Sequence, residues 1–399
     1  MASEPLPPPA PPDRTTTGPA VAPPGWYADP HDPTAWRWWD GRAWTMFTSR
    51  PTGPRRPRLP RWLSPPVLAC GIVVALGLVV IAIGSPVSLL AGVIPLFIVL
   101  PVLRWLDRVE PEPASSRIHA ILWGGTVAVL VSLIVNVVTI VVVGELVAMV
   151  VSAPLIEEAM KAMGVIWAVR RRELDGISDG IVYAGWVALG FAVVEDVTYF
   201  VSADVEGALL GTVILRGVLT PFAHPLFTFW SGLAIGRAVA RSTPVFPSMW
   251  WGYGLAVLTH GAWNGTLALG DLAYTDDPDV GVAVILAGIV LFGVLFAAVA
   301  VALFLFRRRE QQSFVAGVGR MVMYYGLTPA EASMFTGWKP MLAARRRLPR
   351  ARRRDFDRVH AALARLVALH GRTDQVDLAD ERVLAEQLTE ALTRYRTPR

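Results

Sequence analysis

Two adjacent glutamates and a lysine one helical turn later lie inside a strongly apolar segment of the chain. They are Glu157, Glu158 and Lys161, in the stretch L-I-E-E-A-M-K. On a helix, Lys161 falls at i+4 and i+3 from the two carboxylates, close enough to pair with both. A charged side chain at bilayer depth costs several kcal/mol, so it seldom lies there without a partner or a chemical task. A buried carboxylate beside a like charge is a stronger base than one in water, and such a base can activate a water molecule.

Further polar side chains lie in the apolar segments that follow. They are Glu195, Asp196, Arg216, His224, His260 and Asn264. Taken singly, each has a structural explanation, such as a buried ion pair or a histidine bonded to a backbone carbonyl. Taken together, they supply a base, polarising groups and oxyanion donors within one bundle, which favours a hydrolytic site. Pro154 precedes the glutamate pair, and Pro221 and Pro225 flank His224. Prolines open the helix where a cavity or neighbouring protein satisfies the backbone groups that they leave without partners.

The pattern assigns a role to each group in a metal-free reaction. Adjacent helix residues point about 100° apart, so only one of Glu157 and Glu158 faces the water directly. We expect Glu157 to be the base and Glu158 to orient or tune it, with the reverse assignment as the alternative. His224 and His260, helped by Asn264, would hold or protonate the oxyanion. Glu195 would position the water or a histidine.

A zinc site is the alternative for the same side chains, because two histidines and a glutamate form a known catalytic ligand set. The ligands would be Glu158, His224 and His260. The chain has no H-E-x-x-H spacing, and these ligands would come from separate spans. Its single cysteine, Cys70, excludes both an intrachain disulfide and a cysteine-built metal site. The sequence therefore favours a metal-free site.

The elements that must position these side chains are membrane helices. Hydrophobic residues make up 53% of the 399-residue chain and charged residues 17%, with a mean hydropathy of +0.46. Such a composition is typical of a polytopic membrane protein. Windows of about 20 apolar residues predict eight spans, at 67–84, 86–103, 118–143, 146–169, 177–200, 208–236, 246–270 and 280–306.

Arginines indicate the orientation of these spans. They precede the first span and follow the second, fourth, sixth and eighth, whereas the other four loops contain no Lys or Arg. By the positive-inside rule, both termini are cytoplasmic. We therefore expect an all-α, multi-pass protein of the bacterial plasma membrane.

Four motifs in this order resemble the PrsW family of intramembrane proteases, which is related to the CAAX prenyl protease group. They are E-E-x-x-K at 157–161, F-x-x-x-E-D at 191–196, His224 in the sixth span, and His260 followed by W-N in the seventh. The resemblance covers roughly residues 118–270. It implies cleavage of membrane-anchored proteins, with anti-sigma factors as one class of substrate, and a glutamic-type mechanism. Asp196 departs from the family pattern, which commonly has Asn there.

Two flanking regions fall outside the resemblance. Residues 1–24 are Pro-rich and predicted to be disordered. Residues 25–48 hold five tryptophans and turn signals, which predict a small β-like module. This module resembles the short Trp-rich unit found at the N-termini of many actinobacterial membrane proteins. A basic linker at 49–66 leads to the membrane domain at 67–306.

The last region, 307–399, is predicted to be an Arg-rich, helical cytoplasmic tail. Its stretch at 355–369 has apolar residues three and four apart, which indicates a helix. The basic cluster at 345–354 favours anionic lipid headgroups as its partner, and we expect no nucleic acid.

Two other classes of function stay open from the sequence. Membrane carboxylates and histidines also build proton relays, so a proton- or ion-coupled transporter is one alternative. The chain shows no internal repeat relating its two halves, a feature of many transporter folds. A non-catalytic membrane scaffold with the same fold is the other alternative.

Overall fold

The structure is a computed structural model that describes residues 25–39, 44–49, 63–109, 111–324, 327–335, 337–372 and 378–396. The Pro-rich segment 1–24 and most of the basic linker 49–66 lie outside these described residues. The chain divides into two compact units, Met1–Leu59 and Pro60–Arg399.

The first unit contains a three-stranded antiparallel sheet. Its strands are β1 (Gly25–Asp29), β2 (Asp32–Trp39) and β3 (Trp44–Ser49), in the order β1-β2-β3. The register places Trp26 opposite Trp38 and Trp39 opposite Trp44.

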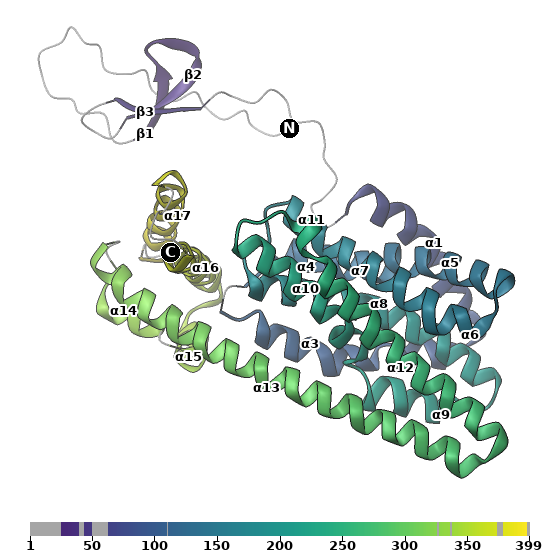
Figure 1. Cartoon of the computed structure of the whole chain (residues 1–399). Helices are drawn as coiled ribbons and strands as arrows, with labels where there is room; N and C mark the ends of the chain where they lie inside the picture. The colour runs from purple at the N-terminus through teal and green to yellow at the C-terminus, as the bar shows by residue number, and fades with distance from the viewer. Residues whose placement is uncertain are drawn as a thin grey trace, which may run out of the picture. The chain divides into compact units, whose positions relative to one another are not determined.

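The second unit is all-helical. Its helices up to the tail are α1 (Pro65–Gly84), α2 (Pro86–Ala91), α3 (Ile94–Leu106), α4 (Ala114–Leu122), α5 (Val129–Val142), α6 (Glu145–Val147), α7 (Ala153–Arg170), α8 (Ile177–Val205), α9 (Leu209–Thr212), α10 (Ala223–Ala240), α11 (Val245–Ser248), α12 (Trp250–Asp276) and α13 (Pro278–Tyr324). Three π-helical segments, η1 (Trp123–Ala128), η2 (Ala148–Ser152) and η3 (Val213–Leu219), continue from helices. Figure 1 shows the elements along the chain.

Six helices among the described residues are long and apolar enough to cross a membrane, whereas the sequence predicts eight spans. The six are Pro65–Gly84, Pro86–Leu106, Ala114–Val142, Ile177–Val205, Leu209–Ala240 and Pro278–Gly319. The predicted spans 146–169 and 246–270 are also helical, in η2 with α7 and in α12. Their composition explains the difference. The first contains Glu157, Glu158 and Lys161, and the second contains His260 and Asn264.

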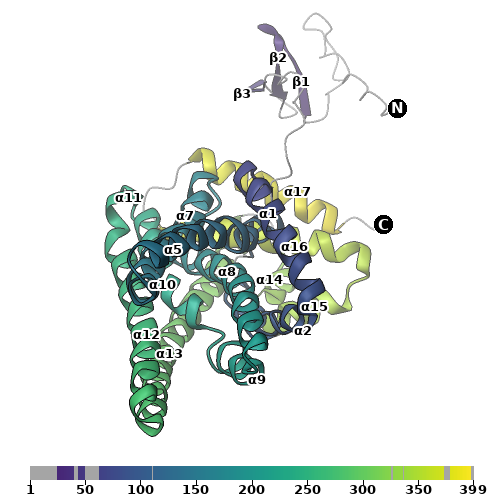
Figure 2. The same ribbon diagram turned by 90° about the vertical axis from the view of Figure 1, so that its right-hand side faces the viewer.

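Helix α8 is the central element of the bundle: 78% of the residues in its most apolar 18-residue stretch are buried. Figure 2 shows it surrounded by labelled neighbours, including α5 and α10. Glycines allow the close packing on both sides. A Cβ at Gly190 would lie 1.9 Å from the carbonyl oxygen of Ile121, and a Cβ at Gly180 would lie 2.3 Å from that of Gly232 on α10. These contacts hold the carboxylates of α8 next to the histidines of the following helices.

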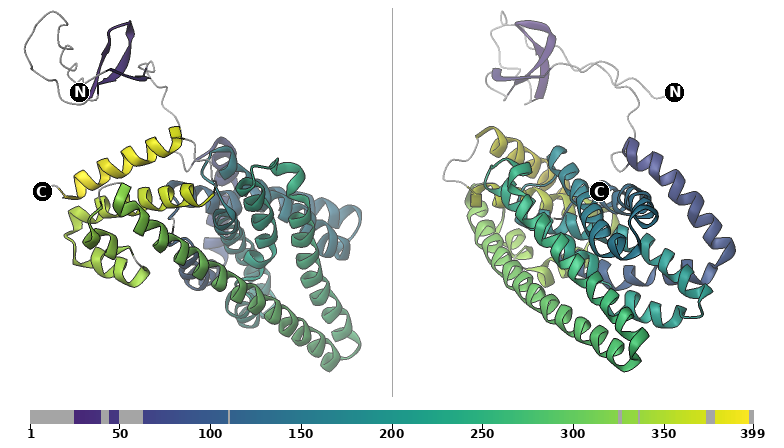
Figure 3. Two further views of the ribbon diagram at one scale, coloured as in Figure 1. Left: turned by 60° about the vertical axis from the view of Figure 1, so that its left-hand side comes forward. Right: turned by 45° about the vertical axis from the view of Figure 1, so that its right-hand side comes forward.

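Prolines and π-segments interrupt the helices near the predicted site. Pro154 lies in the first turn of α7, directly after η2. The helix stops between η3 and α10, at Pro221, so His224 lies in the first turn of α10. The expected opening of the helix at Pro221 is therefore confirmed. Helix α13 lies beside α12, as Figure 3 shows.

Helix α13 has 47 residues and continues past residue 306 without a break, so the predicted boundary at 306/307 lies inside it. The tail helices are α14 (Pro329–Met334), α15 (Trp338–Arg347), α16 (Arg350–Arg372) and α17 (Leu378–Arg396). The predicted helix 355–369 is confirmed within α16. Phe314 of α13 packs with Leu363 of α16 and Leu388 of α17 in a second apolar core, which also includes Val109 from the loop after α3.

Candidate active site

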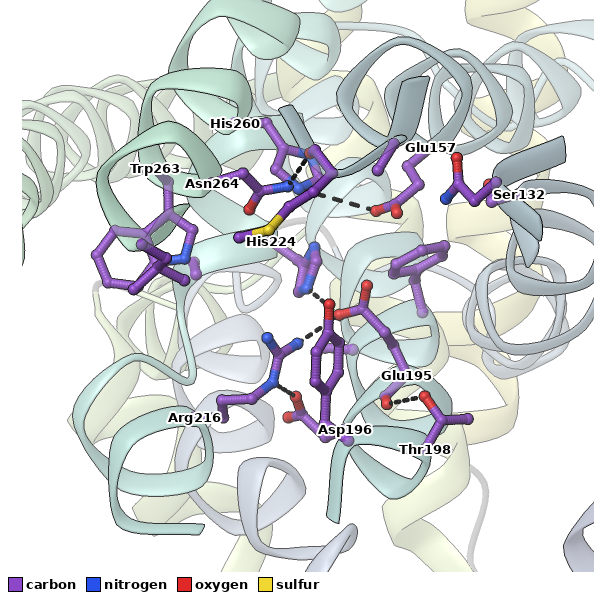
Figure 4. A pocket seen from close by; sticks show the side chains of 18 of the residues that line it. Ser132, Glu157, Glu195, Asp196, Thr198, Arg216, His224, His260, Trp263 and Asn264 are labelled. Atoms are coloured by element: carbon purple, nitrogen blue, oxygen red, sulfur yellow. Dashed lines mark hydrogen bonds and ion pairs between the residues drawn. The ribbon is translucent and has the colours of Figure 1, made fainter. Parts of the chain in front are cut away.

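Seven of the nine side chains selected from the sequence line one cavity of about 480 Å³. These are Glu157, Glu195, Asp196, Arg216, His224, His260 and Asn264. They come from α7, α8, η3, α10 and α12 (Figure 4). The remaining two, Glu158 and Lys161, are fully buried behind the cavity wall. Residues separated by more than one hundred positions in the sequence are thus brought together as the motifs predict.

The two adjacent glutamates have different surroundings. Glu157 lines the cavity, where its Oε2 lies 3.4 Å from Lys161 Nζ and 3.9 Å from His260 Nε2. Glu158 Oε1 accepts hydrogen bonds from Lys161 Nζ at 2.9 Å and from His260 Nδ1 at 3.1 Å. Its Oε2 accepts a hydrogen bond from Thr228 at 2.8 Å. Glu157 is therefore the carboxylate that can meet water, and Glu158 is fully engaged by protein donors.

Thr228 is a site residue that the sequence reasoning missed. Its side chain is fully buried, and its hydroxyl donates to the Glu158 oxygen that neither Lys161 nor His260 uses. A threonine in an apolar helix is unremarkable by composition. The available signal was its spacing, since Thr228 lies at i+4 from His224 and so faces the same side of α10.

Hydrogen bonds fix the tautomers of both histidines. A carboxylate only accepts hydrogen bonds, so His260 donates from Nδ1 to Glu158 and His224 donates from Nε2 to Glu195 Oε2 at 2.8 Å. Lys161 Nζ lies 3.0 Å from His224 Nδ1 and must be the donor there. Two neutral imidazoles satisfy all these bonds. In that state neither ring has an N–H left for an oxyanion, and the lone pair of His260 Nε2 faces Glu157.

Lys161 is the charge that links these groups. The predicted pairing with both glutamates is confirmed, and the ammonium also lies 3.9 Å from the centre of the Phe191 ring. It therefore offsets the charge of the glutamate pair in a place where no solvent reaches it.

Glu195 and Asp196 are both held by Arg216. Arg216 Nη2 donates to Glu195 Oε2 at 2.5 Å, and its Nε donates to Asp196 Oδ1 at 2.7 Å. The guanidinium also lies 3.8 Å from the ring centre of Tyr199. Asp196, the position that departs from the family pattern, is thus neutralised by an arginine. Because Arg216 and His224 share one oxygen of Glu195, the arginine helps to fix the carboxylate that orients this histidine.

Asn264 does not contact either histidine through a hydrogen bond that the structure shows among its described residues. Its Nδ2 donates instead to the carbonyl oxygen of Met149 at 2.9 Å, within η2. A π-segment leaves backbone groups that need partners, and Asn264 supplies one. The expected help of Asn264 in holding an oxyanion stays a prediction, since Asn264 lines the cavity. Its bond to Met149 also secures the segment before the glutamate pair.

The donors present suit a metal ion of the zinc type. Glu157, His224 and His260 each offer one ligand atom, and these atoms lie within 4.8 Å of one another. Zinc ligands at about 2.0–2.1 Å from the ion lie roughly 3.4 Å apart, so the three atoms must move closer to share one ion. Glu158 and Glu195 already hold the other nitrogens of the rings, as carboxylates do behind metal-bound histidines. The structure groups Glu157, rather than the Glu158 of the sequence-based zinc set, with the histidines.

Comparison with known proteins agrees with the motifs. Residues 112–304 match the family described as PrsW family intramembrane metalloprotease, and residues 24–57 match a domain family described as a protein of unknown function, DUF2510.

Three curated relatives all carry the name "Protease PrsW". The chain is 30% identical to that of Geobacillus kaustophilus over 180 residues, 44% of this chain and 78% of the relative. It is 31% identical to that of Oceanobacillus iheyensis over 111 residues, 28% of this chain and 49% of the relative. It is 30% identical to that of Clostridioides difficile over 154 residues, 37% of this chain and 64% of the relative. No solved structure matches the chain.

Proposed function

The chain belongs to the PrsW family of intramembrane proteases, and from this premise we propose that it hydrolyses peptide bonds of membrane-anchored proteins in the cavity around Glu157. The observation that supports this proposal is the meeting of Glu157, Glu195, His224 and His260, from four different helices, around one cavity in a multi-pass membrane protein. Anti-sigma factors are the substrate class that the family resemblance implies.

We propose that the reaction uses a divalent metal ion held by Glu157, His224 and His260. When bound there, such an ion would polarise the attacked carbonyl and lower the cost of deprotonating a water molecule. The tautomers support this choice over the metal-free mechanism favoured from the sequence, because neutral rings with their N–H groups on carboxylates cannot donate to an oxyanion. They offer lone pairs, which a metal ion needs.

The remaining residues position the ligands. Glu158 keeps the Nε2 lone pair of His260 turned toward Glu157, and Thr228 keeps Glu158 in place. Glu195, steadied by Arg216, does the same for His224. Lys161 competes for the lone pair of His224 Nδ1, so an ion that binds this nitrogen leaves the ammonium to Glu158.

We also propose that both termini are cytoplasmic and that the basic tail lies against anionic lipid headgroups. The arginine pattern of the loops supports the orientation. Arg346, Arg347, Arg350 and Arg354 are exposed on α15 and α16, which supports contact with headgroups. The proposed division places the protease domain at 67–306, between the Trp-rich module at 25–48 and the tail at 307–399.

A cleavage assay with a matched carboxylate control tests the function. The protein is co-expressed with a panel of single-span membrane proteins, as wild type, as Glu157→Gln and as Glu145→Gln. Glu145 also lines the cavity, but it is exposed. Among the described residues, its side chain forms no ion pair or hydrogen bond. We expect wild type and Glu145→Gln to cut at least one panel member, and Glu157→Gln to leave it uncut while folding normally.

Chelation distinguishes the two mechanisms. We expect a chelator to stop cleavage by the purified protein and added zinc to restore it, whereas a metal-free enzyme would keep cutting. Cleavage by Glu157→Gln at the wild-type rate would contradict the proposal. Proton-driven uptake into vesicles, lost in Glu157→Gln, would identify a transporter instead.

A further inference from the structure

The active-site cavity reaches the lipid-facing surface of the bundle. Leu133 and Ile140 of α5 line the cavity while 50% and 46% exposed, and Tyr199 of α8 lines it while 46% exposed. A side chain can line the cavity and be exposed on the surface only at the rim of an opening. Since these residues lie in helices that are apolar and long enough to cross a membrane, the opening faces acyl chains.

The two sides of this opening are α5 and η3. On α5, Leu133, Asn136 and Ile140 line the cavity at spacings of three and four residues, so one stripe of the helix faces it. On η3, Leu215 and Arg216 line it from the other side. Figure 4 shows Ser132 and Arg216 on opposite sides of the labelled group.

The rim of the cavity extends past the end of α5. Glu145 is exposed and also lines the cavity, and it follows Gly144, whose positive φ of 115° lets the chain reverse between α5 and α6. A charged residue at a reversal between two spans belongs at the membrane–water boundary. Water can thus reach Glu157 from this end without crossing lipid.

Ser132 offers an unused hydrogen-bonding group in the cavity wall. Its side chain lines the cavity and is 2% exposed, yet its Oγ has no hydrogen-bond partner among the described residues. Thr126 and Thr139, in the same continuous helix, each donate to the carbonyl four residues earlier. A buried hydroxyl without a partner costs free energy, which is recovered when a ligand supplies that partner.

We propose that a membrane-embedded segment of the substrate enters the cavity sideways, between α5 and η3, and that Ser132 Oγ binds its unwound backbone. The inference rests on the proposed function, because the bound ligand is a peptide to be cut. A peptide bond becomes open to attack only when its segment leaves the helical form, and the backbone groups released in lipid need new partners. Ser132 provides one of them inside the cavity, while water arrives from the end marked by Glu145.

Bulky substitutions on the two sides of the opening test this route, with each neighbour as a control. Leu133 and Leu215 line the cavity, whereas Ile134 and Ile214 point to lipid at 57% and 46% exposure and do not line it. The probe is the single-span test protein that wild type cuts. We expect Leu133→Trp and Leu215→Trp to slow its cleavage by about tenfold or more, because the segment is displaced from the reacting groups. Ile134→Trp and Ile214→Trp should stay within about twofold of wild type.

Ser132→Ala tests the backbone contact. It should slow cleavage by about three- to tenfold, the loss of one hydrogen bond to the substrate, while thermal stability stays unchanged because no internal bond is removed. A fall in stability that matches the fall in cleavage would assign Ser132 a structural role and overturn the contact.

A photo-crosslinking amino acid provides a readout that does not need turnover. It is placed at 133, 134, 214 or 215 in the Glu157→Gln protein, co-expressed with the same test protein. We expect adducts from 133 and 215 and few from 134 and 214. Equal adducts at all four positions, or none at 133 and 215, would overturn the route. If wild type cuts no member of the panel of single-span proteins, adducts of a panel member at 133 and 215 but not at 134 and 214 would keep the route and reject the protease function. Normal cleavage of the test protein by both Trp variants would keep the protease function and reject the route.

Discussion

Glu157 and Glu158 are neighbours in sequence and perform different tasks because adjacent helix residues point about 100° apart. One lines the cavity, and the other is surrounded by Lys161, His260 and Thr228. A single conservative change at either glutamate therefore has a different physical meaning. Loss of Glu157 removes a carboxylate that lines the cavity and that, in the proposed reaction, holds the metal ion, whereas loss of Glu158 removes the acceptor of the His260 hydrogen bond.

Thr228→Val tests this second role. The change leaves an oxygen of Glu158 buried without a donor, which we expect to lower the free energy of unfolding by about 1–3 kcal/mol. Partners behind metal ligands typically contribute about 10–100-fold to metal affinity, so zinc affinity should fall within that range. Equilibrium dialysis with zinc and thermal unfolding measure the two effects.

Thr228→Ser is the control, because it keeps the hydroxyl. It should restore zinc affinity to within about threefold of wild type. If Thr228→Val binds zinc as tightly as wild type, Glu158 does not depend on this hydroxyl and the positioning role is wrong.

The sequence identifies site residues whose side chains are charged or carry an imidazole within an apolar segment. Glu157, Glu195, His224 and His260 stand out because a charge or an imidazole in a lipid-spanning segment is costly. Thr228 and Ser132 do not stand out, since hydroxyls are tolerated in any membrane helix. Their importance comes from what they face, and only the packing of α10 and α5 against their neighbours reveals it.

At the level of elements, close contact between helices sets the position of the carboxylates on α8. Gly190→Ala should displace α8 from α4, because the added Cβ would lie 1.9 Å from the carbonyl oxygen of Ile121. Overpacking against a backbone atom costs about 3 kcal/mol, and a shift of α8 moves Glu195 away from His224. Thermal unfolding in detergent and cleavage of the test protein should both show the loss.

Gly77→Ala in α1 is the matched control, because nothing lies within 4 Å of its added Cβ. It should leave unfolding unchanged or raise the midpoint slightly, as expected for alanine in a helix. Equal behaviour of the two variants would show that the close packing of α8 is not needed.

The sequence predicted the helices well and their membrane character less evenly. Uniformly apolar segments such as α1 and residues 280–306 of α13 are recognised by composition alone. Helix α7 contains Glu157, Glu158 and Lys161, and α12 contains His260 and Asn264, and these polar side chains weaken the composition signal of a span. The π-segments η2 and η3 could not be predicted from composition or periodicity. The bond from Asn264 to the carbonyl oxygen of Met149 in η2 joins residues that are distant in the sequence.

At the level of the whole molecule, α13 joins the membrane bundle to the apolar core of the tail. His360 of α16 lies in that core. Its ring is stacked on that of Phe335 and edge-on to that of Phe314 of α13, and the ring centroids are 5.9 Å apart in each pair. Burial lowers the pKa of His360 from 6.5 to about 4, and the charge of Asp357 offsets this only in part. The histidine is therefore neutral in the folded tail at neutral pH.

This histidine predicts a pH dependence of the tail. His360 becomes protonated below about pH 6.5 in the unfolded state, but only below about pH 4 in the folded state. The tail should therefore lose stability as pH falls through this window, by on the order of 3 kcal/mol in total. Hydrogen exchange of peptides from α16, corrected for the intrinsic pH dependence of exchange, measures the change.

His360→Phe should abolish this dependence, because it removes the titrating group and keeps an aromatic ring in the core. Exchange in wild-type α16 that does not change between pH 7 and pH 5 would contradict the prediction. Asp107, in the loop after α3, also titrates near this range, because burial raises its pKa to about 6. Since Asp107 is present in both proteins, the difference in exchange between wild type and His360→Phe reports on His360 alone.

In the proposed reaction, Glu157, His224 and His260 act as one unit. The direct measurement is the cleavage rate of the single-span test protein by Glu157→Gln, His224→Ala, His260→Ala and the triple variant. Residues that act as a unit lose their effect together, so each single variant should fall by about a thousandfold or more, to the level of the triple variant. The shared site would be contradicted if the loss in the triple variant equalled the product of the three single losses. Near-normal cleavage by any single variant would also contradict it.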